Sequence, residues 1–148
     1  MLNKRKIVQE IVQCFQSGGK IIVVGNGGSA TMASHLAGEF IGKFEFQRKP
    51  LPAISLFDLS SLTAIANDYG YEYIFSRPLE ALGKQGDILI ILSTSGKSKN
   101  CLRAIQQAKK QYMTIIDWPR KGTSTAKIQE FQLKLIHDIC REVEKYFV

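Results

Sequence analysis

Several features that would assign a chain to a special class are missing from this sequence. No apolar run approaches the ~18 residues that a membrane-spanning helix needs, so no membrane partner is expected. The opening stretch MLNKRKIVQEIVQC contains basic residues but also Glu10, and it lacks a cleavage-site pattern, which argues against a signal peptide. Neither an internal repeat nor a low-complexity linker is present. With 45% hydrophobic residues, the sequence predicts one globular domain over residues 1–148.

Cysteine is scarce, and acidic residues are fewer than basic ones. Cys14, Cys101 and Cys140 are odd in number and form no Cys-x-x-Cys pair, so they are interpreted as reduced thiols of a cytoplasmic protein. The net charge of +7 suits either an anionic ligand or nucleic acid. The lysines and arginines are scattered, however, without a basic run interleaved with aromatic residues. A basic solvated surface is therefore favoured, and no nucleic-acid partner is expected.

What the sequence does contain is a regular alternation of apolar strands and amphipathic helices. Helices are predicted over residues 2–17, 29–42, 60–68, 74–83, 98–111 and 125–147, and strands over 20–25, 51–56, 88–92 and 112–117. Ser60 or Ser61 is expected to cap the third helix. Such alternation is typical of parallel strands covered by helices on both faces. The predicted fold is a three-layer α/β/α sandwich with a parallel sheet, of the flavodoxin or Rossmann type.

Two of the predicted strands end in turns rich in glycine and hydroxyl groups. The turns are GNGGSA, residues 25–30, and STSGKS, residues 93–98, and each leads into a helix. Backbone N–H groups and the positive end of the helix dipole then face the carboxyl end of the sheet, where open α/β sheets bind ligands. Glycine permits a close backbone approach, and hydroxyl groups add donors to phosphate oxygens. Together the two turns predict a phosphate site.

Neither turn fits a common nucleotide-binding motif. GNGGSA has Gly25 and Gly27, but the acidic residue after the next strand, Asp58, is too distant for the dinucleotide-binding fingerprint. SGKSKN contains Gly-Lys-Ser but lacks the earlier glycine that a P-loop requires. The predicted phosphate site therefore belongs to neither class.

The helix after the first turn carries His35 and Glu39 one turn apart. At this spacing the two side chains share a helix face, which suits two metal ligands, or a base and the group that orients it. A surface ion pair is the alternative. The chain has one other histidine, His137, eight residues after Gln129 in the last predicted helix. Eight residues span about 12 Å along a helix, so Gln129 and His137 reach one ion only with extended side chains, and a substrate role remains open for one of them.

Three stretches of the sequence resemble the phosphoheptose (sedoheptulose-7-phosphate) isomerases, which have the sugar-isomerase (SIS) fold. They are GNGGSATMASHLAGEF, AIANDYGYEYIFSRPLEALGKQGDILIILSTSGKS and TAKIQEFQLKLIH. The resemblance covers nearly the whole chain. It implies conversion of sedoheptulose 7-phosphate to D-glycero-D-manno-heptose 7-phosphate through an enediol, for heptose in lipopolysaccharide or another surface glycan. It also implies a homotetramer whose active sites are shared between subunits.

The resemblance also implies which residues form the site. The substrate-binding residues would be Asn26, Gly27, Gly28, Ser29, Asn67, Asp68, Ser93, Thr94, Ser95, Ser98, Thr125 and Gln129. The implied metal ligands, for zinc, are His35, Glu39, Gln129 and His137. Glu39 is assigned as the proton-abstracting base and His137 as its acid–base partner, although these roles are interchangeable. For Thr125 an N-cap role is at least as well supported by its position, and Asp68 is equally suited to starting a turn.

Three departures from the family pattern stand out. Lys43 occupies a position where many relatives have arginine, and lysine lacks the bidentate fork. The relatives usually have a longer N-terminal helical hairpin. They also have about twenty more residues, with a further strand, between the fourth strand and the last helix. Here Asp117 leads almost directly to Trp118. Because an unpaired sheet edge is costly, we expect residues to be missing from the sequence at this join rather than a strand to be lost.

Two alternatives to the isomerase remain. The first is a non-catalytic SIS module that binds a phosphosugar or a protein, like the relatives that associate with the replication initiator. Those relatives lack the His-and-Glu arrangement, whereas this chain keeps His35, Glu39 and His137. The second is another phosphosugar reaction on the same fold, such as etherase or aminosugar isomerase chemistry, which the pattern of Gln129 and His137 disfavours.

Overall fold

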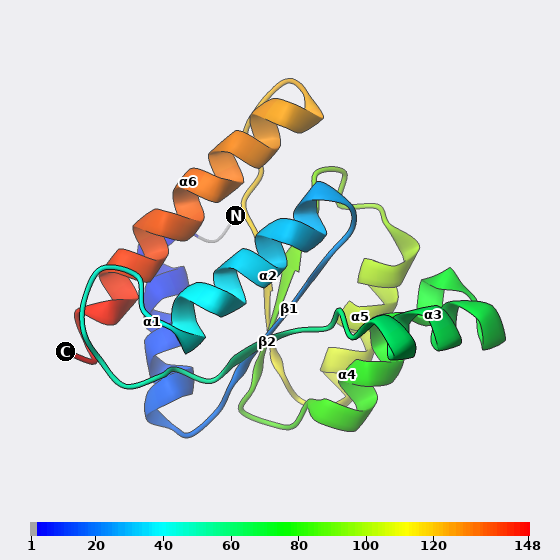
Figure 1. The fold of residues 1–148 in the computed structure, drawn as a ribbon, viewed down its shortest axis with the longest axis horizontal. Helices are drawn as coiled ribbons and strands as arrows, with labels where there is room; N and C mark the ends of the chain where they lie inside the picture. The colour runs from blue at the N-terminus through cyan, green and yellow to red at the C-terminus, as the bar shows by residue number, and fades with distance from the viewer. Residues whose placement is uncertain (1–2) are drawn as a thin grey trace.

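A parallel sheet lies at the centre of the molecule. The computed structural model describes residues 3–148 and shows helices on both sides of this sheet (Figure 1). Its strands are β1 (Ile21–Gly25), β2 (Ala53–Ser55), β3 (Ile88–Leu92) and β4 (Thr114–Asp117), in the order β2-β1-β3-β4. Strands β1 and β3 are buried along their whole length, as expected for the centre of a parallel sheet that is covered on both faces. Ile21 pairs with Ala53 on one side and Ile88 on the other.

Two hydrophobic cores hold the helices against this sheet. The helices are α1 (Lys4–Gln16), α2 (Gly28–Ile41), α3 (Leu59–Asp68), η1 (Tyr71–Tyr73), α4 (Ser76–Leu82), α5 (Lys99–Lys110) and α6 (Thr125–Glu144), of which η1 is a short 3-10 helix. One core joins α1, α2 and α6 to one face of the sheet, and the other joins α4 and α5 to the opposite face. The predicted three-layer α/β/α sandwich is therefore confirmed.

The local predictions failed mainly at the caps and ends of elements. Asp58, rather than Ser60 or Ser61, caps α3, because its carboxylate accepts the N–H of Ser61. Ser124 caps α6 by accepting the N–H of Lys127, so the N-cap expected at Thr125 is wrong and Thr125 is the first helical residue. In both helices a good capping residue stands just before the predicted one and reaches the N3 amide.

Strand β2 is shorter than the stretch 51–56 predicted for it. Its pairing with β1 begins at Ala53, directly after Pro52. Proline has no N–H to donate to a neighbouring strand, which limits the pairing that this segment can make.

The connection from β4 to α6 runs through residues 118–124. The backbone N–H of Trp118 donates to the Ile91 carbonyl at 2.9 Å, and the Trp118 side chain is fully buried. In the described part of the chain β4 pairs only with β3, so it forms one edge of the sheet. The expectation that residues are missing at this join stays a prediction.

Within residues 3–148 no helix combines the length and apolar composition that crossing a bilayer requires.

Candidate active site

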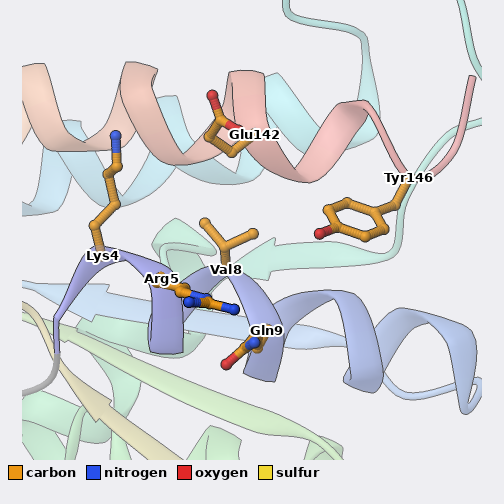
Figure 2. Close-up of a pocket in the computed structure, with 6 residues that line it drawn as sticks. All are labelled: Lys4, Arg5, Val8, Gln9, Glu142 and Tyr146. Carbon is orange, nitrogen blue, oxygen red and sulfur yellow. The ribbon is translucent and has the colours of Figure 1, made fainter.

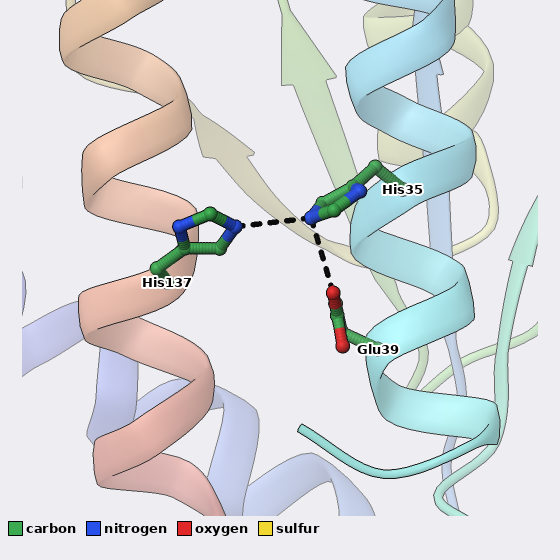
Figure 3. Close-up of side chains that lie close together, drawn as sticks. All are labelled: His35, Glu39 and His137. Carbon is green, nitrogen blue, oxygen red and sulfur yellow. Dashed lines mark hydrogen bonds and ion pairs between the residues drawn. The ribbon is translucent and has the colours of Figure 1, made fainter. Parts of the chain in front are cut away.

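Helices α2 and α6 bring three side chains together, two of them far from the third in the sequence. The His35 Nε2 atom lies 3.1 Å from Glu39 Oε1, one helical turn away, and 3.1 Å from His137 Nε2 across the gap to α6 (Figure 3). The cluster is partly open to solvent, because His35 is exposed and the other two residues are half-buried. The cluster is therefore not sealed from solvent.

The cluster also has the donor set of a metal site. One ligand atom from each of the three residues lies within 4.8 Å of the others. Zinc bonds to histidine nitrogen and carboxylate oxygen are ~2.1 Å long, which places neighbouring ligand atoms about 3.3 Å apart in a tetrahedron. The two 3.1 Å separations are close to that value. Three protein ligands with an open fourth position are typical of catalytic rather than structural zinc. The three residues thus fit a zinc ion.

Gln129, the fourth predicted ligand, stands elsewhere. A Cβ atom built on Gly28 would lie only 2.6 Å from Gln129 Nε2, so the amide covers the first turn of α2. Gly28 and His35 are seven residues apart, or about 10 Å along the helix axis. In this structure the Gln129 amide therefore lies beside the glycine-rich turn and not beside His35. This position suits a contact with substrate.

The first glycine-rich turn, residues 25–30, depends on close backbone packing. A Cβ atom at Gly25 would lie 2.7 Å from the Ser29 carbonyl oxygen and 2.8 Å from that of Leu92, so only glycine fits where β1 turns into α2. Gly27 precedes α2 with a φ of +55°, a conformation that favours glycine. Ser29 is buried in the first turn of α2, and its N–H donates to the Asn26 carbonyl at 2.9 Å. The predicted residues 26–29 thus form one continuous turn at the start of the helix.

The second turn uses some of its hydroxyl groups to hold its own shape. Ser93 Oγ accepts the Gly96 N–H at 3.0 Å, and Ser95 Oγ accepts the Lys97 N–H at 3.1 Å. Ser98 precedes α5 as its N-cap residue, but its hydroxyl makes no capping bond. Within residues 3–148, Thr94 and Ser98 are the hydroxyl residues of this turn whose oxygens stay uncommitted.

Asn26 holds the two turns together. Its amide exchanges hydrogen bonds of 2.9 and 2.8 Å with Asn100, and its oxygen accepts the Tyr71 hydroxyl at 3.0 Å. A hollow of about 660 Å³ opens at this point, at the N-terminal end of α5. Its lining includes Asn26, Tyr71, Ser98 and Asn100. Sequence reasoning missed Tyr71 and Asn100, because a lone tyrosine after a turn and an asparagine at a helix start are common in purely structural roles.

Arg120 is a further residue that the sequence did not single out. Its Nε atom donates to the Ser93 carbonyl at 2.9 Å, and its guanidinium pairs with Asp117. It lies directly over Gly96, where an added Cβ atom would be 3.0 Å from Nη2. The guanidinium, paired with Asp117, therefore lies beside the second glycine- and hydroxyl-rich turn. No spacing motif marks this residue, since its place depends on the path from β4 to α6.

The remaining predicted residues lie apart from the cluster. Asn67 and Asp68 are exposed at the end of α3 and bond to each other at 3.0 Å. Helix α3 lies on the side of the molecule away from α6, so one chain does not bring these residues to His137 (Figure 1). Thr125 is exposed at the start of α6.

A separate hollow of about 360 Å³ lies between α1 and α6 (Figure 2). It is lined by Lys4, Arg5, Val8, Gln9, Glu142 and Tyr146, none of which the sequence analysis assigned to the site. The candidate active site is therefore formed by the histidine–glutamate cluster and the two turns at the carboxyl end of the sheet.

Comparison with known proteins agrees with this geometry. The SIS domain family model matches residues 3–117. The phosphoheptose isomerase of Campylobacter concisus (strain 13826) is 42% identical over 156 residues, covering 94% of this chain and 82% of that protein. The phosphoheptose isomerase of Burkholderia pseudomallei (strain K96243) is 46% identical, covering 95% and 80%. Both alignments are longer than this chain, so the relatives carry residues within the matched stretch that it lacks.

Solved structures give the same result. Phosphoheptose isomerase GmhA from Neisseria gonorrhoeae superposes with a TM-score of 0.89 at 34% identity, covering 96% of this chain and 85% of that one. A phosphoheptose isomerase from Francisella tularensis superposes with a TM-score of 0.92 at 31% identity, with the same coverage. In sequence and in fold, the chain belongs to the SIS domain family and, within it, to the phosphoheptose isomerases.

Proposed function

We propose that this chain isomerises sedoheptulose 7-phosphate to D-glycero-D-manno-heptose 7-phosphate, supplying heptose for lipopolysaccharide or another surface glycan. The observation that carries the proposal is the contact of His35 with both Glu39 and His137, in a chain that also has two glycine- and hydroxyl-rich turns predicted to bind phosphate. A module that only binds a phosphosugar requires the turns, but it does not require acid–base groups that are accessible to solvent. The non-catalytic alternative is therefore not favoured, and the curated relatives at 41–46% identity are named as isomerases.

The reaction moves one proton between neighbouring carbon atoms. Glu39 removes a proton from C1 of the ketose, the C2 carbonyl oxygen gains a proton from His137, and the enediol results. Loss of the proton on the C1 hydroxyl and return of a proton to C2 then give the aldose. His35 fixes Glu39 by their 3.1 Å contact, which aligns the carboxylate for proton transfer. The roles of Glu39 and His137 are interchangeable in this scheme.

We further propose that His35, Glu39 and His137 hold a zinc ion, with Gln129 as a substrate contact. The support is the match between the observed ligand separations and zinc geometry. Zinc bound there would polarise the substrate carbonyl and stabilise the enediolate. Glu39 has two carboxylate oxygens and His137 has two ring nitrogens, so ligation by one atom of each leaves the other able to accept or donate a proton.

The placement of α3 supports a homotetramer with shared sites. This helix carries the predicted substrate residues Asn67 and Asp68, yet it buries no residue within its own chain. Leu59, at its start, is 76% exposed. A neighbouring subunit that covers α3 would bring Asn67 and Asp68 to another chain's cluster.

A cytoplasmic location is proposed because the three cysteines are buried and form no disulfide.

The decisive experiment compares the purified protein with Glu39→Gln, each with and without added zinc, in the turnover of sedoheptulose 7-phosphate. We expect the substitution to lower kcat by at least about 100-fold, because general acid–base groups contribute roughly 10²- to 10⁴-fold. Glu130→Gln is the control, since Glu130 is an exposed carboxylate on α6 that pairs only with Lys127 among the described residues. A folded protein that binds the sugar phosphate without turning it over under any metal would contradict the proposal.

A further inference from the structure

The loop after α2 is fastened to the C-terminal turn of α6 by one buried carboxylate. Glu144 accepts the backbone N–H groups of Phe44 at 2.6 Å, Glu45 at 2.8 Å and Phe46 at 3.1 Å. Its side chain has no access to solvent. Three consecutive amides on a single carboxylate fix the path of the loop, because each hydrogen bond to a charged acceptor is stronger than a neutral one.

Arg48 completes this fastening from the other end of the loop. Its Nη2 atom lies 2.9 Å from Glu144 Oε1, and its side chain is also fully buried. The same guanidinium donates to the carbonyl of Glu39 at 2.7 Å and to that of Phe40 at 2.8 Å, at the end of α2. The buried pair thus ties the turn that carries Glu39 to the helix that carries His137. Burying two charges is expensive, so a loop held in this way is unusual for a simple connection.

The loop held in this way places the ring of Phe44 against His137. It stacks on the imidazole of His137, with ring centroids 5.3 Å apart and planes inclined by 20°. The guanidinium carbon of Arg141, one turn further along α6, lies 5.6 Å from the centre of the same ring. One face of the His137 imidazole therefore packs against the Phe44 ring. The Nε2 atom at the edge of the same imidazole points to His35.

We propose that Phe44 is a positioning residue for the isomerase reaction. Its ring, held in place by Glu144 and Arg48, keeps the imidazole of His137 turned so that Nε2 faces His35 and Glu39. This inference rests on the proposed function only for its effect on turnover. The orientation of His137 is a property of the structure alone.

The test compares Phe44→Leu and Phe44→Tyr with the wild type. Leucine keeps an apolar contact but removes the flat ring, so we expect kcat to fall about tenfold or more with KM changed less than threefold, because small misplacements of catalytic groups are costly. Tyrosine restores the ring and should restore kcat. Phe46→Leu is the matched control, because Phe46 lies in the same loop and donates to the same carboxylate. It should leave kcat within twofold of the wild-type value.

A spectroscopic measurement separates this inference from the proposed function. The chain has only two histidines, so the imidazole protons of His137 are readily assigned by NMR with a His35→Gln variant. In chelator-treated protein, the ring current of Phe44 should shift the His137 protons upfield in the wild type and in Phe44→Tyr, but not in Phe44→Leu. A folded Phe44→Leu protein with wild-type kcat, or with unchanged His137 shifts, would overturn the inference. A wild type without turnover would refute the proposed function and leave the shift measurement to decide on Phe44.

Discussion

Glu144 shows how a single charged residue can set the pH range over which the fold is stable. Burial on its own would raise the pKa of this carboxyl, but the N–H groups of Phe44, Glu45 and Phe46, together with Arg48, hold the pKa below its ordinary value. A carboxyl with a lower pKa in the folded than in the unfolded state stabilises the fold fully above its unfolded pKa. That stabilisation is lost as the pH falls through the folded pKa.

We therefore expect the free energy of unfolding to decrease as the pH falls below about 4, the ordinary range for glutamate. Glu144→Gln should be less stable near neutral pH, because Arg48 is left without its partner, and should lose less stability on acidification. Denaturant titrations between pH 3 and 7 measure both effects. Equal losses in the two proteins over this range would show that another carboxyl is responsible.

The three cysteines give a second prediction at the residue scale. Burial, followed by the nearby Asp117 charge, raises the pKa of the Cys101 thiol to about 11, and burial with the Asp87 charge raises that of Cys14 to about 11. Burial also raises the pKa of Cys140. Because only the thiolate reacts, labelling of the native protein at pH 8 should be about 100-fold slower than labelling of the unfolded chain. Rapid labelling of the native protein by a thiol reagent would contradict the burial of these groups.

Among the elements, α2 links the first glycine-rich turn to the cluster of His35, Glu39 and His137. Two of its glycines, Gly28 and Gly38, have different surroundings. An added Cβ atom at Gly28 would collide with Gln129, whereas one at Gly38 meets nothing within 4 Å. Gly28→Ala should displace the Gln129 amide and raise KM for sedoheptulose 7-phosphate several-fold.

Gly38→Ala is the control on the same helix. It should leave KM unchanged and stabilise the fold by about 0.5–1 kcal/mol, since glycine inside a helix is unfavourable relative to alanine. Steady-state kinetics and denaturant titrations distinguish the two substitutions. Equal KM values for both variants would mean that Gln129 has no role in binding substrate.

The same helix shows how far the sequence could predict the structure. Apolar periodicity located α2, and the i,i+4 rule placed His35 beside Glu39, because both depend only on local helix geometry. The contact with His137 required knowing that α2 and α6 lie side by side, which no local pattern states. Arg120, Arg48 and Phe44 were not predicted for the same reason. Their roles arise from loops whose paths depend on tertiary contacts, and a single arginine or phenylalanine in a loop carries no periodic signal.

At the scale of the whole molecule, one chain separates residues that the proposed reaction needs together. The acid–base cluster and the exposed end of α3 lie on different sides of the sheet (Figure 1). For the proposed homotetramer, light scattering should give a mass about four times the 16.6 kDa of one chain. Leu59→Glu should weaken this assembly without unfolding the subunit, because Leu59 is 76% exposed in one chain. A stable monomer that retains full turnover would contradict both the assembly and the shared site.

Mixing subunits tests the shared site directly. Glu39→Gln removes the proposed base, and Asp68→Asn alters the exposed substrate residue on α3. Each variant alone should turn over sedoheptulose 7-phosphate slowly. If Glu39 and Asp68 act across a subunit boundary, tetramers assembled from both variants contain some sites with neither substitution, and turnover should return to a sizeable fraction of the wild-type rate. If native mass spectrometry, with one variant isotopically labelled, confirms mixed tetramers and turnover does not return, Asp68 either serves the cluster of its own chain or does not contribute to the site.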